Sequence, residues 1–389
     1  MKIAMLGQKG IPVQQGGVER HVEELSRALV SLGHEVRIYG RTWFTGQQDG
    51  MIDGIELKHT AGIKTKHLDA ITHTFTALLH AMYSGVDVIH FHAVGPSLLS
   101  WIPRIFTPHI MVVSTFHSID RKQEKWGYFA KIALWVGEWA ACTFPHKTIA
   151  VSKTIRQYIR DTYSKEAEYI PNGVPAYAAQ TTTATLDTFD LVPKQYILVV
   201  SRLISNKAIH HAIAAFIKAK TNNSISSKMK LVVVGSGHYT DSYASYLHSL
   251  ANGRADIIFT GAQYGTALAE LYTHAGLYVH MSKLEGMPIT VLEAMSYGLP
   301  ILVSDIPEHC ELITDPAYYC STNDTTTIVE RMSEILSKTE SEKQTLGEMY
   351  KKQVKKQFDW KRIGKQTSEL YDDLQTRKPA PMSMTSAAM

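Results

Sequence analysis

The chain has few cysteines, no long uncharged apolar run and little net charge. Its three cysteines, Cys142, Cys310 and Cys320, are odd in number and lack metal-ligand spacing, which indicates a reducing compartment. No stretch of about twenty apolar residues is free of charge, so we expect no membrane-spanning helix. The apolar run 3–6 is followed at once by the polar stretch 7–10, so it is too short for a signal peptide.

Several functional motifs are also missing. A net charge of +4 over 389 residues does not suggest bulk nucleic-acid binding. Residues 7–10, Gly-Gln-Lys-Gly, do not make the Gly-x-Gly-x-x-Gly fingerprint, which argues against an NAD-dependent oxidoreductase. No Asp-x-Asp pair or His/Cys cluster has metal spacing, so we expect no metal and no cofactor. The composition, 44% hydrophobic and 20% charged, is that of a globular protein long enough for two domains.

The most informative stretch runs from Glu285 to Pro300 and carries two glutamates eight positions apart. Pro288 lies where a helix can begin, because a proline in the first helical position loses no helical hydrogen bond. The amides from Ile289 onward are then free to bind an anion with the help of the helix dipole. Gly286 removes a side chain where a ligand would approach the backbone.

The two glutamates, Glu285 in the loop and Glu293 inside the helix, suit sugar recognition. A carboxylate accepts two hydrogen bonds at once, which matches a vicinal diol of a ribose or hexose. Acidic residues near a helix start are also common because they complement the helix dipole. The glutamates alone therefore leave both interpretations open.

The N-terminal half repeats a strand, loop and helix pattern. Residues 2–6 read as a strand, 18–32 as a helix with apolar spacings of three and four, and 35–39, 86–92 and 110–116 as further strands. This pattern predicts a doubly wound parallel sheet. Gly16 and Gly17 precede the helix, where they could receive a phosphate or a sugar. The alternative is that they only form a tight turn. His117 follows a strand, where ligands usually gather, although it can instead bond loop carbonyls.

Residues 122–144 are rich in aromatics, including Trp126, Phe129, Trp135 and Trp139, and carry a few lysines. An aromatic, basic helix of this kind suits a membrane surface or a lipid-linked acceptor. The alternative is a core helix with a few polar positions. We favour the core helix.

The second half begins after a threonine- and alanine-rich stretch, 178–190, which we interpret as a linker. The strand, loop and helix pattern restarts at 196–200. Arg202 and Lys207 flank the next loop and suit a diphosphate, with solvated loop charges as the alternative. Gly235 and Gly261 end two further strands, and strand 277–280 leads to Glu285. We predict domains at 1–180 and 191–357, a helix at 358–376 that returns to the first domain, and a disordered tail at 377–389.

With these motifs in place, the chain resembles the family 4 retaining glycosyltransferases over nearly its whole length. That family has the GT-B fold, α/β in class, with two Rossmann-like domains facing across a cleft. The motifs that carry the resemblance are Gly16 to Glu19, Phe116-His117 with Asp120, 171–174 (Pro-Asn-Gly-Val), 201–203 (Ser-Arg-Leu) with Lys207, and Glu285 to Glu293 followed by 298–300 (Gly-Leu-Pro).

The resemblance implies a nucleotide-sugar donor held by the second domain. Glu293 is then expected on the ribose, Glu285 on the donor sugar, and Arg202 and Lys207 on the diphosphate, while His117 touches the sugar near the reacting centre. The implied catalytic residues are His117, Arg202, Lys207 and Glu285, and the implied donor-binding residues are Gly16, Gly17, Arg202, Lys207, Gly235, Glu285, Gly286, Met287, Pro288, Ile289 and Glu293. The cations and the helix end replace a metal, and the leaving phosphate deprotonates the acceptor.

Residues 7–12 and 120–126 resemble a branch that contains rhamnosyltransferase-type enzymes of cell-surface polysaccharide assembly. The implied reaction is transfer of a hexose or deoxyhexose to a glycan or lipid-linked acceptor, in the cytoplasm, with contact to the inner membrane face if the aromatic helix reaches it. The chain departs from the family at Ala208 and Ser118, where glycine is usual, and at Met287-Pro288. A nucleotide-sugar 2-epimerase and a non-catalytic sugar-nucleotide-binding subunit are the rival readings.

Overall fold

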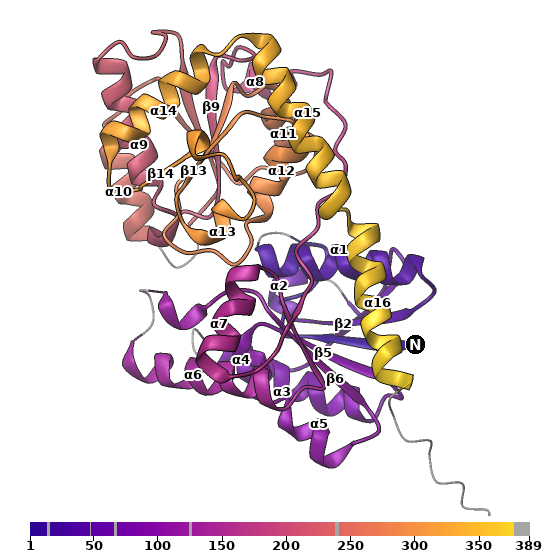
Figure 1. The fold of residues 1–389 in the computed structure, drawn as a ribbon. Helices are drawn as coiled ribbons and strands as arrows, with labels where there is room; N and C mark the ends of the chain where they lie inside the picture. The colour runs from indigo at the N-terminus through magenta and orange to yellow at the C-terminus, as the bar shows by residue number, and fades with distance from the viewer. Residues whose placement is uncertain (14–15, 47, 66–67, 124–126, 238–240, 377–389) are drawn as a thin grey trace, which may run out of the picture.

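The computed structural model describes residues 1–13, 16–46, 48–65, 68–123, 127–237 and 241–376. Two parallel sheets lie in separate halves of the molecule, each covered by helices (Figure 1). The first sheet has the strand order β3-β4-β2-β1-β5-β6-β7-β8, and the second has the order β11-β10-β9-β12-β13-β14. Only the β3–β4 pair is antiparallel among the described strands. The predicted fold class, two α/β domains, is confirmed.

The first sheet is built from strands before residue 170 and is covered by seven helices of very different length among the described residues. The strands are β1 (Lys2–Leu6), β2 (Glu35–Gly40), β3 (Gly50–Ile52), β4 (Ile55–His59), β5 (Val88–His92), β6 (Met111–Phe116), β7 (Lys147–Ala150) and β8 (Glu168–Tyr169). The helices are α1 (Gly17–Ser31), α2 (Thr42–Thr45), α3 (Asp69–Met82), α4 (Val94–Ser97), α5 (Trp101–Phe106), α6 (Tyr128–Thr143) and α7 (Lys153–Tyr163), with a 3₁₀ turn η1 (Asp120–Lys122).

The second sheet is buried on both faces, as a parallel sheet between helices must be. All five residues of β9 (Tyr196–Val200) are buried. The other strands are β10 (Lys230–Val234), β11 (Ile257–Gly261), β12 (Leu277–His280), β13 (Ile301–Ser304) and β14 (Tyr319–Cys320). The helices are α8 (Ala184–Thr188), α9 (Ile209–Thr221), α10 (Asp241–Ala251), α11 (Gly265–His274), α12 (Ile289–Tyr297), α13 (Pro307–Cys310), α14 (Thr325–Ser337) and α15 (Glu340–Gln357), with 3₁₀ turns η2 (Ser205–Lys207) and η3 (Pro316–Tyr318).

The last helix, α16 (Trp360–Thr376), crosses from the second half back to the first and lies along α1 (Figure 1). Gly364 allows the close approach, because a Cβ there would lie 2.6 Å from the Cβ of Ala28. Further along, Tyr371 Oη lies 2.6 Å from Nδ1 of the buried His90. The C-terminal helix therefore ties the two halves together. The predicted tail, 377–389, lies outside the described residues.

The stretch 178–190, interpreted above as a linker, packs on the second domain rather than running free. Thr185 N–H donates to Glu270 at 2.7 Å, and Gln180 N–H donates to Thr273 Oγ1 at 3.1 Å. Leu186 of α8 is fully buried. The threonine- and alanine-rich composition of this stretch has no clear helical period, so it did not reveal the short helix that these contacts stabilise.

Loops at the carboxyl ends of strands in the two sheets meet between the domains. Asn172, which follows β8, donates from Nδ2 to the carbonyl of Met287 at 2.8 Å. Glu311, which follows α13, accepts hydrogen bonds from the backbone amides of Lys153 and Thr154 at the start of α7. These contacts join the loop after β12 and the segment after β13 to the first domain, so the predicted site residues of the loop after β12 lie at the interface.

The aromatic helix differs from the core helix that we favoured. Tyr128 and Phe129 of α6 are 75% and 85% exposed, and Trp135 is 50% exposed. Only the side that carries Glu138, Ala140 and similar residues is buried against the domain. The prediction was wrong because hydrophobicity indicates burial in general but does not reveal which face of a helix the rest of the fold covers. Among the described helices, none is long and apolar enough to cross a membrane.

Candidate active site

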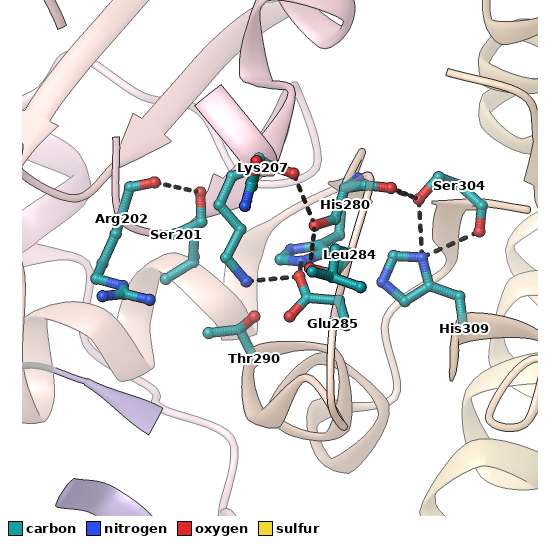
Figure 2. A network of polar contacts seen from close by, with 12 residues as sticks. Ser201, Arg202, Lys207, His280, Leu284, Glu285, Thr290, Ser304 and His309 are labelled. Carbon is teal, nitrogen blue, oxygen red and sulfur yellow. Dashed lines mark hydrogen bonds and ion pairs between the residues drawn. The ribbon is translucent and has the colours of Figure 1, made fainter. Parts of the chain in front are cut away.

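Glu285 is the centre of a buried polar cluster at the carboxyl end of β12. Its Oε1 atom lies 2.5 Å from Lys207 Nζ and 2.9 Å from His280 Nε2 (Figure 2). Lys207 comes from η2, which follows β9, and His280 is the last residue of β12. Because β9 and β12 are neighbours in a parallel sheet, their carboxyl ends bring the three side chains together.

The charge of Glu285 is stabilised despite its burial. Burial alone would raise the pKa of this carboxyl, but the Lys207 ammonium and the hydrogen bond with His280 outweigh burial and hold the pKa well below its usual range. Burial lowers the pKa of His280 below its usual value, so this imidazole is neutral at pH 7. The cluster therefore presents an ionised carboxylate beside an ammonium group.

Arg202 occupies a different position from Lys207, although both follow β9. It is exposed, and in Figure 2 its guanidinium stands apart from Glu285, with Lys207 between them. The one contact drawn for it runs from Ser201 Oγ to its backbone carbonyl, at 3.4 Å. The structure thus brings Lys207 and Glu285 together and leaves the Arg202 side chain open to solvent.

Ala208 shows why glycine is the common residue after this lysine. Its backbone has φ 47° and ψ 32°, in the left-handed region, and its side chain is fully buried. A residue with a Cβ is strained in this conformation, whereas glycine adopts it freely. The chain accepts that strain at the turn that delivers Lys207 to Glu285.

The start of α12 corrects two details of the prediction. Pro288 is the residue before the helix, with ψ 108°, rather than its first helical residue. Gly286 makes room for a protein group, because a Cβ there would lie 1.6 Å from the carbonyl oxygen of His117. The anion-binding hypothesis is not contradicted, because no side chain caps α12 and no described backbone carbonyl accepts from the Ile289 or Thr290 amide. The Ile289 and Thr290 amides thus remain for a ligand.

Glu293 lies inside α12 in surroundings unlike those of Glu285. Its two carboxylate oxygens accept hydrogen bonds from the hydroxyls of Tyr177, at 3.3 Å, and Tyr272, at 3.1 Å. Burial raises the pKa of Glu293, although Arg20 of α1 acts in the opposite direction. The carboxylate is thus held by neutral donors and faces a cation from the first domain.

Gly16 and Gly17 begin α1, the helix that carries Arg20. Gly16 has φ 108°, a conformation that favours glycine, and a Cβ there would collide with the Glu19 carboxylate. Arg20 Nη2 lies 3.4 Å from Tyr177 Oη, which in turn reaches Glu293. The first turn of α1 therefore lies near the Glu293 end of the site, on the side of the first domain.

Gly235 follows β10 and allows a tight approach of two loops. Its φ is 145°, and a Cβ would lie 1.9 Å from the carbonyl oxygen of Ser201. This contact holds the loop after β10 against the residue that precedes Arg202. The glycine is therefore required by the backbone packing of the site whether or not a donor touches it.

His117 belongs to a buried histidine cluster in the first domain. Its Nε2 atom lies 3.1 Å from His92 Nδ1, and its ring packs edge-on against His21 with 4.7 Å between centroids. Burial holds the pKa of His117 and of His92 well below the usual value, and lowers that of His21 to about 4. These imidazoles are neutral at pH 7, and His117 meets the second domain through its backbone at Gly286.

Within the described part of the chain, two groups of side chains have metal-ligand atoms within 4.8 Å of one another: His21, His92 and His117, and His280, Glu285 and His309. In the second group, Lys207 already pairs with Oε1 of Glu285. In the first group, two of the nitrogens already share a hydrogen bond. The expectation of a metal-free site stays a prediction, and chelation tests it.

Sequence reasoning missed four contributors to the site: Arg20, His21, Tyr177 and His280. His280 was within reach, because it ends a strand exactly as His92 does and the same argument from strand ends applies to it. Arg20 and His21 lie in the helix after Gly17, where side-chain direction is not evident from spacing alone. Tyr177 lies 116 residues from Glu293 in the sequence and contacts it only because the segment between the domains passes α12.

The two halves of the chain match two family models. Residues 15–176 match Glycosyltransferase Family 4, and residues 190–353 match Glycosyl transferases group 1. The matched ranges are separated by residues 177–189, and together they contain all the site residues named above except Tyr177.

Similarity to individual proteins extends over nearly the whole chain. An uncharacterised glycosyltransferase of Methanocaldococcus jannaschii is 25% identical, over 95% of this chain and 98% of that protein. The phosphatidylinositol N-acetylglucosaminyltransferase GPI3 subunit of Saccharomyces cerevisiae is 22% identical, over 97% of this chain and 84% of that protein. Among solved structures, the Anabaena HepE complex with UDP-glucose superposes with a TM-score of 0.76 at 16% identity, covering 96% of this chain and 100% of that one.

Proposed function

Because the chain is a group 1, family 4 retaining glycosyltransferase with the GT-B fold, we propose that it moves a hexose or deoxyhexose from a nucleotide-diphosphate sugar to a glycan or lipid-linked acceptor. One observation carries the proposal more than any other. Lys207 and Glu285 form a buried ion pair beside the uncapped start of α12, against the His117 loop of the opposite domain. A cation, an ionised carboxylate and free amides suit a sugar diphosphate.

The donor lies along the second domain in this proposal. The Ile289 and Thr290 amides and the charges of Lys207 and Arg202 bind the diphosphate. Glu285 accepts hydrogen bonds from the sugar hydroxyls, and Glu293 accepts them from the ribose. Gly16 and Gly17 close over the phosphates from the first domain, and Gly235, Met287 and Pro288 shape the loops around them.

The chemical step requires stabilisation of negative charge on the leaving group. As the bond between the anomeric carbon and the diphosphate oxygen breaks, both bonding electrons go to that oxygen. Lys207, Arg202 and the α12 amides stabilise the charge that forms. The neutral His117 touches the sugar near the reacting carbon. An oxygen of the leaving diphosphate takes the acceptor hydroxyl proton as the new glycosidic bond forms on the same face.

Acceptor and pathway are the finer parts of the proposal. The resemblance of residues 7–12 and 120–126 to rhamnosyltransferase-type enzymes supports a role in polysaccharide or glycoconjugate biosynthesis. The yeast relative is named as acting on phosphatidylinositol, which supports a lipid-linked acceptor here. We place the reaction in the cytoplasm, at the inner face of the membrane.

A donor screen tests the proposal. Purified protein is mixed with nucleotide-diphosphate hexoses and deoxyhexoses, and thermal stabilisation and nucleoside diphosphate release are measured. We expect one nucleotide-sugar class to stabilise the protein and to be slowly hydrolysed without acceptor. Conversion to a 2-epimer would establish the epimerase alternative, and stabilisation without hydrolysis or transfer would establish a binding subunit.

A further inference from the structure

Helix α6 of the first domain turns an aromatic face to solvent. Tyr128, Ile132, Trp135 and Trp139 recur at spacings of three and four, so they share one side of the helix. All four are among the exposed large hydrophobic residues, and Phe129 beside them is 85% exposed. We call these five residues the α6 face.

A basic hollow adjoins the α6 face. It has a volume of about 500 Å³ and is lined by three cations and three apolar side chains: Arg121, Lys122, Lys131, Tyr128, Ile132 and Trp135. No acidic residue is among the described residues that line it. The only acid of α6, Glu138, is fully buried and does not line the hollow. An anionic head group therefore finds both cations and apolar surface in this hollow.

One of the three cations, Arg121, is held in place by two hydrogen-bond partners. Arg121 donates from Nε to the buried Glu138 carboxylate at 3.3 Å and from Nη2 to Tyr158 Oη at 2.6 Å. Tyr158 and Tyr163 also donate to the same Glu138 oxygen, at 2.8 and 2.6 Å. A buried carboxylate costs free energy unless a cation or hydrogen-bond donors pair with it. Keeping Arg121 bonded to Glu138 avoids that cost, so the network holds the guanidinium in one position. The arginine at the hollow is thus preorganised.

The hollow also lies close to the active site. Arg121 and Lys122 follow His117 by four and five residues in the chain. The backbone at His117 packs against Gly286, because a Cβ on that glycine would lie 1.6 Å from the His117 carbonyl oxygen. Gly286 directly follows Glu285, so the segment that leads to the hollow starts beside the active site. A head group in the hollow would be presented at the cleft.

We propose that the α6 face and the basic hollow dock on an anionic lipid membrane, with a lipid phosphate in the hollow. Exposed aromatics combined with lysines are typical of helices that lie in a membrane interface. A second copy of the chain is disfavoured, because this surface would bring cations against cations. One part of the inference rests on the proposed function: if the protein transfers a sugar as proposed above, its acceptor is a phosphate-bearing lipid bound in the hollow.

Vesicle cosedimentation tests this inference with the full-length protein. We expect binding to vesicles of phosphatidylcholine and phosphatidylglycerol, weakened by salt, and little binding to phosphatidylcholine alone. Lys122→Glu and Lys131→Glu should each weaken binding by at least about fivefold, and Phe129→Ser with Trp135→Ser should weaken it by about tenfold or more. Lys352→Glu and Met349→Ser, at exposed positions of α15 in the other domain, are the matched controls and should leave binding unchanged.

The outcomes separate this inference from the proposed function. The inference is overturned by equal binding of wild type and face variants, by equal losses in the controls, or by binding of inorganic phosphate without binding of vesicles. Nucleoside diphosphate binding is measured on the same proteins in the absence of lipid. Face variants that keep it show that the fold and donor site are intact, whereas a wild type that binds membranes but no nucleotide contradicts only the proposed function.

Discussion

Glu285 and Glu293 are the same residue type, eight positions apart, and both are buried. Glu285 faces the Lys207 ammonium, which holds the carboxyl ionised with a pKa well below the usual range. Glu293 faces two tyrosine hydroxyls, and burial raises its pKa. The difference shows that one loop and one helical turn provide two sites of opposite electrostatic character. Glu285 is paired directly with a cation, whereas Glu293 accepts hydrogen bonds from neutral hydroxyls and is only near the Arg20 cation.

The largest effect should come from the cations at the Glu285 end. Lys207→Ala should lower turnover by about a hundredfold, at about 3 kcal/mol for a lost charge partner, and should also lower the melting temperature because Glu285 is left buried and unpaired. Arg202→Ala should reduce turnover by a similar factor without a change in melting temperature, because Arg202 is exposed. Nucleoside diphosphate release and thermal unfolding check both results. Wild-type turnover in both variants would disprove the diphosphate assignment.

Steady-state kinetics should separate the two glutamates. Glu285→Gln should mainly lower kcat, by about tenfold to a hundredfold, because a contact to the donor sugar strengthens as the ring gains positive charge. Glu293→Gln should mainly raise KM, because a ribose contact is equal in the ground and transition states. If Glu285→Gln raised KM and Glu293→Gln lowered kcat, the donor site would stand, but Glu285 would bind the ribose and Glu293 the donor sugar. Two folded variants with unchanged kcat and KM would contradict the donor site.

The pH dependence of stability should differ in sign between the same two variants. A carboxyl with a depressed pKa stabilises the fold above its unfolded pKa and loses this as pH falls. Glu285→Gln should therefore be less stable than wild type at pH 7, with a smaller difference in acid. A raised pKa does the opposite, so Glu293→Gln should be more stable than wild type at pH 7 and equal to it in acid. Denaturant unfolding at pH 4 and pH 7 measures both, and equal behaviour would remove the contrast.

The smallest expected effect is that of chelation. Turnover should be unchanged by EDTA, because the Lys207 ammonium already supplies a positive charge beside Glu285. The three histidines His21, His92 and His117 make this a real test, since neutral imidazoles are good metal ligands. Loss of turnover in EDTA, restored by a divalent cation, would show that one of the two groups binds metal.

Much of the fold could be predicted from local pattern. Apolar runs of four to six residues, separated by helical spacings, indicate parallel strands, and the two repeats of this pattern correspond to the two sheets. The exposed side of α6 could not be predicted, because it depends on which face the neighbouring helices cover. The short helix α8 was hidden for a similar reason, as its contacts with Glu270 lie some 85 residues away in the chain.

The site could be predicted in part. Glu285, Lys207 and His280 lie at the ends of adjacent strands, so the position of each follows from the parallel sheet. The direction of each side chain does not follow, and the pairing of Lys207 rather than Arg202 with Glu285 is visible only in three dimensions. Arg20 and Tyr177 reach Glu293 from the first domain and the interdomain segment, and no local pattern indicates such a contact.

Titration calorimetry with a nucleoside diphosphate tests the central claim, that the two glutamates bind different ends of a donor. A nucleoside diphosphate contains the ribose of the donor but lacks the transferred hexose or deoxyhexose. The account predicts that Glu293→Gln weakens its binding by about tenfold, the cost of about one hydrogen bond to a charged group, while Glu285→Gln binds it as wild type does. Weakened binding in Glu285→Gln with normal binding in Glu293→Gln would contradict the account.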